Sequence, residues 1–118
     1  MKTADEFIIR REERAARLNQ ELPRLVKGLV GLGASRVVLF GSAAAGRLGV
    51  TSDLDLIAVI PTDKRPLDRL KWVHEELQPT AADILVYTPA EFEEMKDASP
   101  FVRHALKTGK VMHEARSD

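Results

Sequence analysis

The sequence contains no cysteine and no long run of apolar residues. Without cysteine, a disulfide framework, a thiolate metal site and a cysteine nucleophile are all excluded. No segment approaches the ~18 apolar residues that a membrane-spanning helix requires. The stretch from Met1 to Arg14 is charged and has no apolar run of signal-peptide length. We therefore expect a soluble, cytoplasmic protein with no membrane partner.

An excess of charge of either sign is also lacking. The 18 Lys and Arg residues balance the 18 Asp and Glu residues, so the formal net charge is zero. Such a chain has no general electrostatic attraction to nucleic acid, so the charge balance does not indicate a nucleic-acid partner, although it does not exclude one. The length of 118 residues predicts a single domain over residues 1–118, with residues 1–20 as an N-terminal helical extension.

The pattern of residues predicts helices and strands in a mixed order. Thr3 and Glu6 form a capping box, so a helix is expected to start near Ala4. Pro23 lies inside the apolar pattern that follows, and we expect it to divide this region into two helices. Short apolar or β-branched runs predict strands at 36–40, 53–60 and 82–87, with an added edge strand at 110–113.

Three more helices are expected, after Pro66, after Thr88 and after Ser99. The first of them should bury one stripe of side chains, formed by Leu67, Leu70, Val73 or His74, and Leu77. This order of elements predicts an α/β (α+β) fold, in which a small mixed sheet has helices packed on it.

The segment that carries chemistry begins with Gly41-Ser42 and, after ten further residues, continues with Asp53-Leu54-Asp55-Leu56. Side chains two residues apart in a strand share a face, so Asp53 and Asp55 should point the same way. Two neighbouring carboxylates repel each other, and a cation between them relieves the repulsion. Carboxylate oxygens are ligands that suit magnesium. The pair therefore predicts a magnesium site.

A third carboxylate, Asp83, lies at the start of the next predicted strand. If that strand pairs beside residues 53–60, Asp83 joins the same edge of the sheet. Three carboxylates can hold two metal ions ~3.5–4 Å apart, the arrangement used for in-line phosphoryl displacement. One ion would activate the acceptor oxygen and the other would hold a triphosphate. Asp83 could instead be the base that takes the acceptor proton.

The turn at Gly41-Ser42 suits the phosphates of such a substrate. A glycine lets the backbone approach a phosphate without a Cβ in the way. Ser42 is expected to open a short helix, whose first N–H groups can bind an anion together with the serine hydroxyl.

Taken together, these residues resemble the signature of the minimal nucleotidyltransferases, which belong to the DNA polymerase beta-like superfamily together with kanamycin nucleotidyltransferase. The resemblance extends from Leu22 to Glu114 and includes Asp83. It implies the nucleotidyltransferase fold, Gly41 and Ser42 at the nucleotide phosphates, and Asp53, Asp55 and Asp83 at magnesium. The matching segments are Leu39-Phe40-Gly41-Ser42, Gly46 and Ser52-Asp53-Leu54-Asp55-Leu56.

The sequence departs from the resemblance at one position. Many relatives read Gly-Ser-x-Ala-Arg-Gly, whereas Ala45 stands here in place of the arginine. Arg47 is the candidate to replace it at the nucleotide. The resemblance also implies transfer of AMP from ATP, with a HEPN-family protein as acceptor, as in toxin–antitoxin pairs. Because the chain is small, a partner or a dimer mate is expected to complete the acceptor site.

Two other functions fit parts of the pattern. Phosphatases of the haloacid dehalogenase class also use Asp-x-Asp, but there the pair follows an apolar strand, whereas here the apolar residues follow the aspartates. The second alternative is a catalytically inactive module of the same fold that binds a nucleotide or a partner. Ala45 favours this module, while the intact carboxylates Asp53, Asp55 and Asp83 favour an enzyme.

Overall fold

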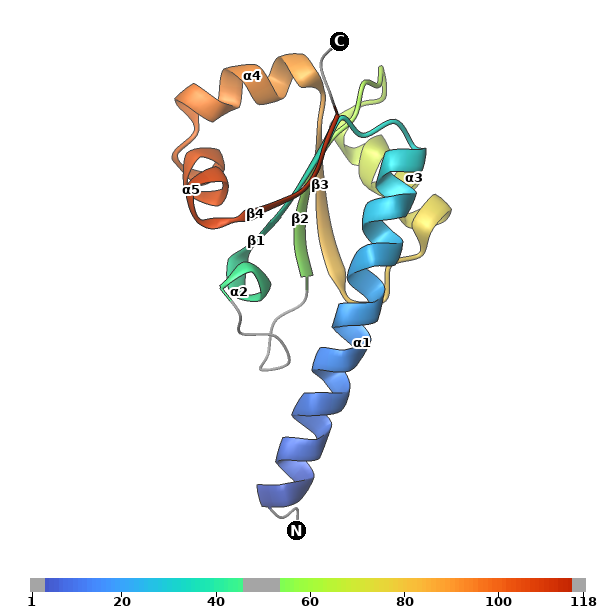
Figure 1. The fold of residues 1–118 in the computed structure, drawn as a ribbon. Coiled ribbons are helices and arrows are strands. Elements are labelled where there is room, and N and C mark those ends of the chain that lie inside the picture. Colours follow the sequence, from blue (N-terminus) through green and yellow to red (C-terminus); the bar gives the residue numbers. More distant parts are fainter. Residues whose placement is uncertain (1–3, 46–53, 116–118) are drawn as a thin grey trace.

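The protein is built around a four-stranded sheet with helices on both sides (Figure 1). The computed structural model describes residues 4–45 and 54–115. Within these ranges, none of the helices has both the length and the apolar composition needed to cross a membrane. The elements are α1 (Ala4–Gly31), β1 (Arg36–Phe40), α2 (Gly41–Ala44), β2 (Leu54–Val59), α3 (Pro66–Leu77), β3 (Ala82–Tyr87), α4 (Pro89–Ala98), α5 (Pro100–Thr108) and β4 (Lys110–Glu114).

The strands lie in the order β3-β2-β1-β4. β1 is antiparallel to both β2 and β4, whereas β2 and β3 are parallel and are joined by the crossover helix α3. The expected mixed sheet is therefore confirmed. Strands 36–40 and 82–87 have the predicted bounds. The strand expected at 53–60 is described as Leu54–Val59, and the expected edge strand is Lys110–Glu114.

The two faces of the sheet have different neighbours because side chains alternate along each strand. Leu54, Leu56 and Ala58 pack with α1 and α3 on what we call the core face. The alternate positions of β2, which are Asp55, Ile57 and Val59, belong to the opposite face, which we call the site face. There Ile57 and Val59 pack with α4 and α5. Figure 1 shows these two pairs of helices on opposite sides of the sheet.

The prediction that Pro23 divides the first helical region is wrong, since α1 runs without interruption through this residue. Pro23 lies on the exposed side of the helix, so the carbonyl that loses its donor can bind water instead. On the other side, Leu18, Leu25 and Leu29 are buried in the core. Packing of this stripe stabilises the helix on both sides of the proline. The N-terminal half of α1 extends well beyond the sheet (Figure 1).

The expected buried stripe of α3 is only partly right. Leu67 is 79% exposed and Leu70 is 38% exposed, while Val73 is buried. Trp72 and Leu77 pack against the core. The helix is rotated relative to the prediction because the residue buried one turn before Val73 is Arg69, not a leucine.

Arg69 is the one charged residue among those described that is buried, at 6% exposed. Its Nε donates to the Lys64 carbonyl at 2.8 Å, and its Nη1 donates to Glu91 Oε1 at 2.7 Å. The same Glu91 closes the predicted capping box with Thr88 at the start of α4. The Arg69 guanidinium holds the pKa of the Glu91 carboxyl below its ordinary value. These bonds join α3, the end of β3 and α4.

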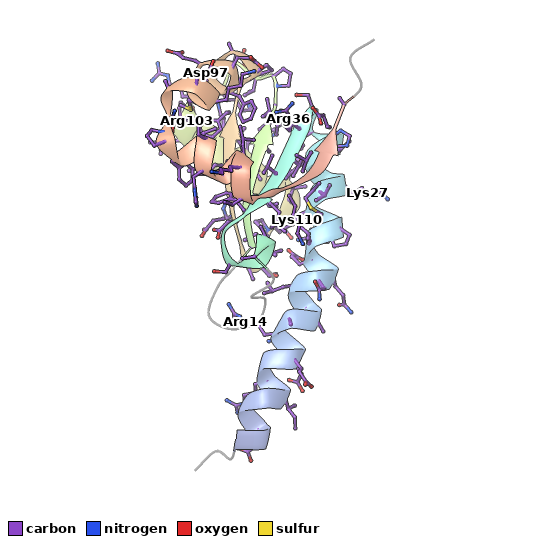
Figure 2. The ribbon with its side chains drawn as sticks, turned by 60° about the vertical axis from the view of Figure 1, so that its left-hand side comes forward. Arg14, Lys27, Arg36, Asp97, Arg103 and Lys110 are labelled. Atoms are coloured by element: carbon purple, nitrogen blue, oxygen red, sulfur yellow. The ribbon has the colours of Figure 1, made fainter. Side chains whose placement is uncertain are left out.

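We expect Arg69→Ala to lower the free energy of unfolding by about 2–4 kcal/mol, because it removes the buried partner of a hydrogen-bonded pair and leaves Glu91, which is 36% exposed, without its cation. Chemical denaturation measures this change. Arg103→Ala is the matched control, since Arg103 is exposed on α5 and its loss should change stability by less than about 0.5 kcal/mol (Figure 2). Equal effects of the two substitutions would show that the buried pair is not structural.

Candidate active site at the Gly41 turn

Two of the predicted carboxylates lie on neighbouring strands at the same level. The parallel register of β2 and β3 pairs Asp55 with Asp83. Residues paired in this way point to the same face, on strands about 4.8 Å apart. Asp83 is exposed and Asp55 is half-buried. The expectation that the third strand pairs beside the second is therefore confirmed, and Asp55 and Asp83 share one edge of the site face.

The main chain at Gly41 lies directly against the Asp55 carboxylate. β1 ends where Phe40 pairs with Asp55, and the next residue, Gly41, has a φ of +73°. A Cβ placed on Gly41 would lie 2.5 Å from Asp55 Oδ2. Any other residue would therefore have a strained backbone, and the Asp55 carboxylate would have to shift to make room for its Cβ. The glycine predicted for close approach to a phosphate thus also lies close to a carboxylate.

The short helix expected after Gly41 is α2, which spans only Gly41–Ala44. Ala43 and Ala44 are buried in the core and anchor this turn, while Ser42 is half-buried. A helix of one turn has a small macrodipole. If this turn binds an anion, the binding must therefore come from local backbone N–H groups and the Ser42 hydroxyl.

Asp53, Gly46 and Arg47 lie outside the described residues. Within residues 4–45 and 54–115, no three His, Asp or Glu side chains are grouped closely enough to hold a metal ion. The structure thus brings together Gly41, Ser42, Asp55 and Asp83.

A cavity that the sequence analysis missed adjoins this turn. It has a volume of about 380 Å³ and lies between the α2 turn and α5. Because its two walls are some sixty residues apart in the chain, no local pattern reveals it. The spacing of the α5 residues shows only that they share one helix face, and not what that face meets. The cavity, which we call the α2–α5 slot, is lined by Phe40, Gly41, Ser42, Ala45, Phe101, His104, Ala105 and Thr108.

A second cleft, of about 360 Å³, lies where α1 passes the start of β3. Its lining includes Arg14, Arg17, Glu21 and Ala81. The Ala81 carbonyl accepts a hydrogen bond from the Leu54 amide at 3.0 Å, so this cleft lies at the same end of the sheet as Asp55 and Asp83. Hydrogen bonding from Arg24 lowers the pKa of Glu21. The cleft therefore combines two arginines with a carboxylate that already has a cationic partner.

Comparison with known proteins identifies the family to which the protein belongs. Residues 16–111 match the nucleotidyltransferase domain family, and because this match covers most of the chain, the protein belongs to that family. A crystal structure described as a "putative nucleotidyltransferase" from Sulfolobus solfataricus has the same fold, with a TM-score of 0.59 and 22% sequence identity. That alignment covers 86% of this chain and 84% of the other. A search of curated proteins found no match.

We expect Gly41→Ala to lower the free energy of unfolding by about 1–3 kcal/mol, from backbone strain and from contact with Asp55. Gly31→Ala is the control, because a Cβ at Gly31 meets nothing within 4 Å. Adding Asp55→Ala to Gly41→Ala should recover part of the loss, since it removes the colliding carboxylate. A double-mutant cycle from denaturation curves measures this coupling, and zero coupling would contradict the close approach.

Proposed function

We propose that the protein is a magnesium-dependent nucleotidyltransferase that transfers AMP from ATP to an acceptor hydroxyl. The supporting observation is the contact of the Gly41 main chain with the Asp55 carboxylate, with Asp83 paired opposite on β3. The protein belongs to the nucleotidyltransferase domain family. Its glycine-serine turn lies beside two carboxylates. Transfer of a nucleotide needs both parts, one for the phosphates and one for the metal.

The donor set fits magnesium. Asp55 and Asp83 supply oxygen ligands from neighbouring strands on one face, and Asp53, two residues before Asp55, is the proposed third ligand. Carboxylates this close repel each other unless a cation or a proton intervenes. Magnesium, when bound, would offset the negative charge of the triphosphate and of the leaving pyrophosphate.

The order of the strands suits an in-line displacement. Asp83 lies on the outer strand β3, Asp55 on β2, and the Gly41-Ser42 turn follows β1. Where Asp83 is the base and not a metal ligand, the acceptor hydroxyl gives its proton to Asp83 while its oxygen bonds to the α-phosphorus. The bond from this phosphorus to the bridging oxygen of pyrophosphate breaks, and pyrophosphate leaves on the side of Gly41 and Ser42. Ser42 would donate its hydroxyl to the phosphates.

The acceptor side is open at this end of the sheet, because Asp83 is exposed. We propose, on the family resemblance, a HEPN-family protein as acceptor, with the protein acting as the antitoxin of the pair. Arg47 is proposed to bind the triphosphate in place of the arginine that Ala45 replaces. A dimer mate is the other candidate for completing the acceptor site.

The test combines calorimetry of magnesium-ATP binding with the intact mass of a HEPN-family protein after incubation with the enzyme and magnesium-ATP. The wild type should bind magnesium-ATP and add AMP to the acceptor. Asp55→Asn should reduce transfer at least about a hundredfold, because it replaces a charged metal ligand with a neutral, weaker one. Asp97→Asn makes the same chemical change at an exposed residue of α4, far from the site, and should have no effect (Figure 2).

Full activity of Asp55→Asn would contradict the proposed role of this carboxylate. A folded wild-type protein that fails to bind magnesium-ATP would contradict the enzyme altogether, and would favour the inactive partner-binding module.

A further inference from the structure

The two walls of the α2–α5 slot differ in character. On the α2 side, the lining side chains are small or absent, at Gly41, Ser42 and Ala45. The residues on the α5 side lie on one face of the helix, and two of them, Phe101 and His104, have large ring side chains. A gap between a flat, small-residue wall and a wall with an aromatic ring suits a planar ligand. The α5 wall consists of Phe101, His104, Ala105 and Thr108.

Phe101 is exposed and packs against a second aromatic ring. Its side chain is 49% exposed, which is unusual for a phenylalanine. The Phe40 ring meets it edge to face, with centroids 5.4 Å apart and an angle of 88° between the planes. Phe40 itself belongs to β1 and pairs with Asp55, so the aromatic pair is tied to the sheet. An exposed, oriented ring at a cavity is a platform on which a nucleobase can stack.

Beyond the Gly41-Ser42 turn, which is proposed to hold the phosphates, the chemistry of the lining favours a base over a phosphate. Among the described residues that line the slot, none is Asp, Glu, Lys or Arg. The polar side chains are the Ser42 and Thr108 hydroxyls and the His104 imidazole, and the Thr108 hydroxyl already donates to the His104 carbonyl at 2.8 Å. A triphosphate needs cations, whereas a heterocycle needs apolar contact and a few hydrogen bonds. The volume of about 380 Å³ is in the range of small-molecule sites.

The position of the slot agrees with this chemistry. Gly41 is shared, since it lines the slot and also touches the Asp55 carboxylate. In the proposed reaction, the phosphorus under attack carries the nucleoside through its ester oxygen. The pocket for the nucleoside must therefore lie near the carboxylates, and the slot is linked to Asp55 through Gly41.

We propose that the α2–α5 slot binds the nucleoside of the substrate, with its base stacked on Phe101. The inference rests on the proposed function, because it names the part of the same site that recognises the nucleotide. It makes Phe101 a binding residue on α5, an element that contributes none of the proposed carboxylates. Ala45 acts by its small size, since a larger side chain there would fill the slot.

The test compares two ligands that share the phosphates but differ in the nucleoside. Calorimetry in the presence of magnesium gives the dissociation constants of ATP and of inorganic tripolyphosphate for each variant. Phe101→Ala should weaken ATP binding about tenfold and leave tripolyphosphate binding nearly unchanged, because only ATP can stack. Ala45→Leu should have the same selective effect from the other wall. Phe101→Tyr keeps the ring and should restore ATP binding.

Leu67→Ala is the control, since this exposed apolar side chain of α3 lies outside the slot and its loss should change neither constant. Equal weakening of both ligands by Phe101→Ala and Ala45→Leu would show that the slot holds phosphates, and would overturn the inference. Unchanged ATP binding in both variants would show that the base lies elsewhere, and would overturn it as well. A wild type that binds neither ligand would instead overturn the proposed function, before any variant is compared.

Discussion

The contact between the Gly41 main chain and the Asp55 carboxylate is the constraint on which the rest of the site depends. It requires the antiparallel register in which Phe40 pairs with Asp55, so that the turn after β1 reaches the carboxylate. The parallel register of β2 and β3 then brings Asp83 beside Asp55. A slip of one residue in either pairing would move a carboxylate to the core face, where burial of an unpaired charge is costly. The same apolar alternation that forms the core therefore aligns the site.

The molecule separates the interactions that stabilise it from those proposed for chemistry. At the C-terminal ends of β2 and β3, Arg69 and Glu91 tie together the crossover helix and the start of α4. At the opposite end of the same strands, Asp55 and Asp83 lie side by side, and Asp83 is exposed. The network around Arg69 holds the strand that carries Asp83 without using any group of the site. Substitution of Arg69 should therefore change stability while leaving the groups proposed for chemistry in place.

Much of the fold could be predicted because its signals are local. The strand at 36–40 is a β-branched and apolar run that ends at Gly41, and Thr88 with Glu91 forms a capping box whatever surrounds it. The two wrong predictions concern helices whose length or orientation is set by tertiary contacts. The continuity of α1 through Pro23 depends on leucines buried against the sheet, and the rotation of α3 depends on Glu91, which is distant in sequence from Arg69.

Part of the candidate site was also predictable, because its motif is local in the sequence. The spacing of Gly41, Ser42 and the aspartates is readable in the chain, and the parallel register adds Asp83. The α2–α5 slot was not predictable, because Phe101 and Ala45 are distant in sequence and line one slot only in the folded protein.

The central claim is that Asp55 and Asp83 bind the metal while the Gly41 turn binds the phosphates. A crystal structure with manganese and a non-hydrolysable ATP analogue tests it most directly, since the anomalous scattering of manganese distinguishes the metal from water. The account predicts manganese bound to Asp55 and Asp83 oxygens, with the analogue's phosphates at Gly41 and Ser42. Manganese bound elsewhere, or phosphates away from the Gly41 turn, would contradict it.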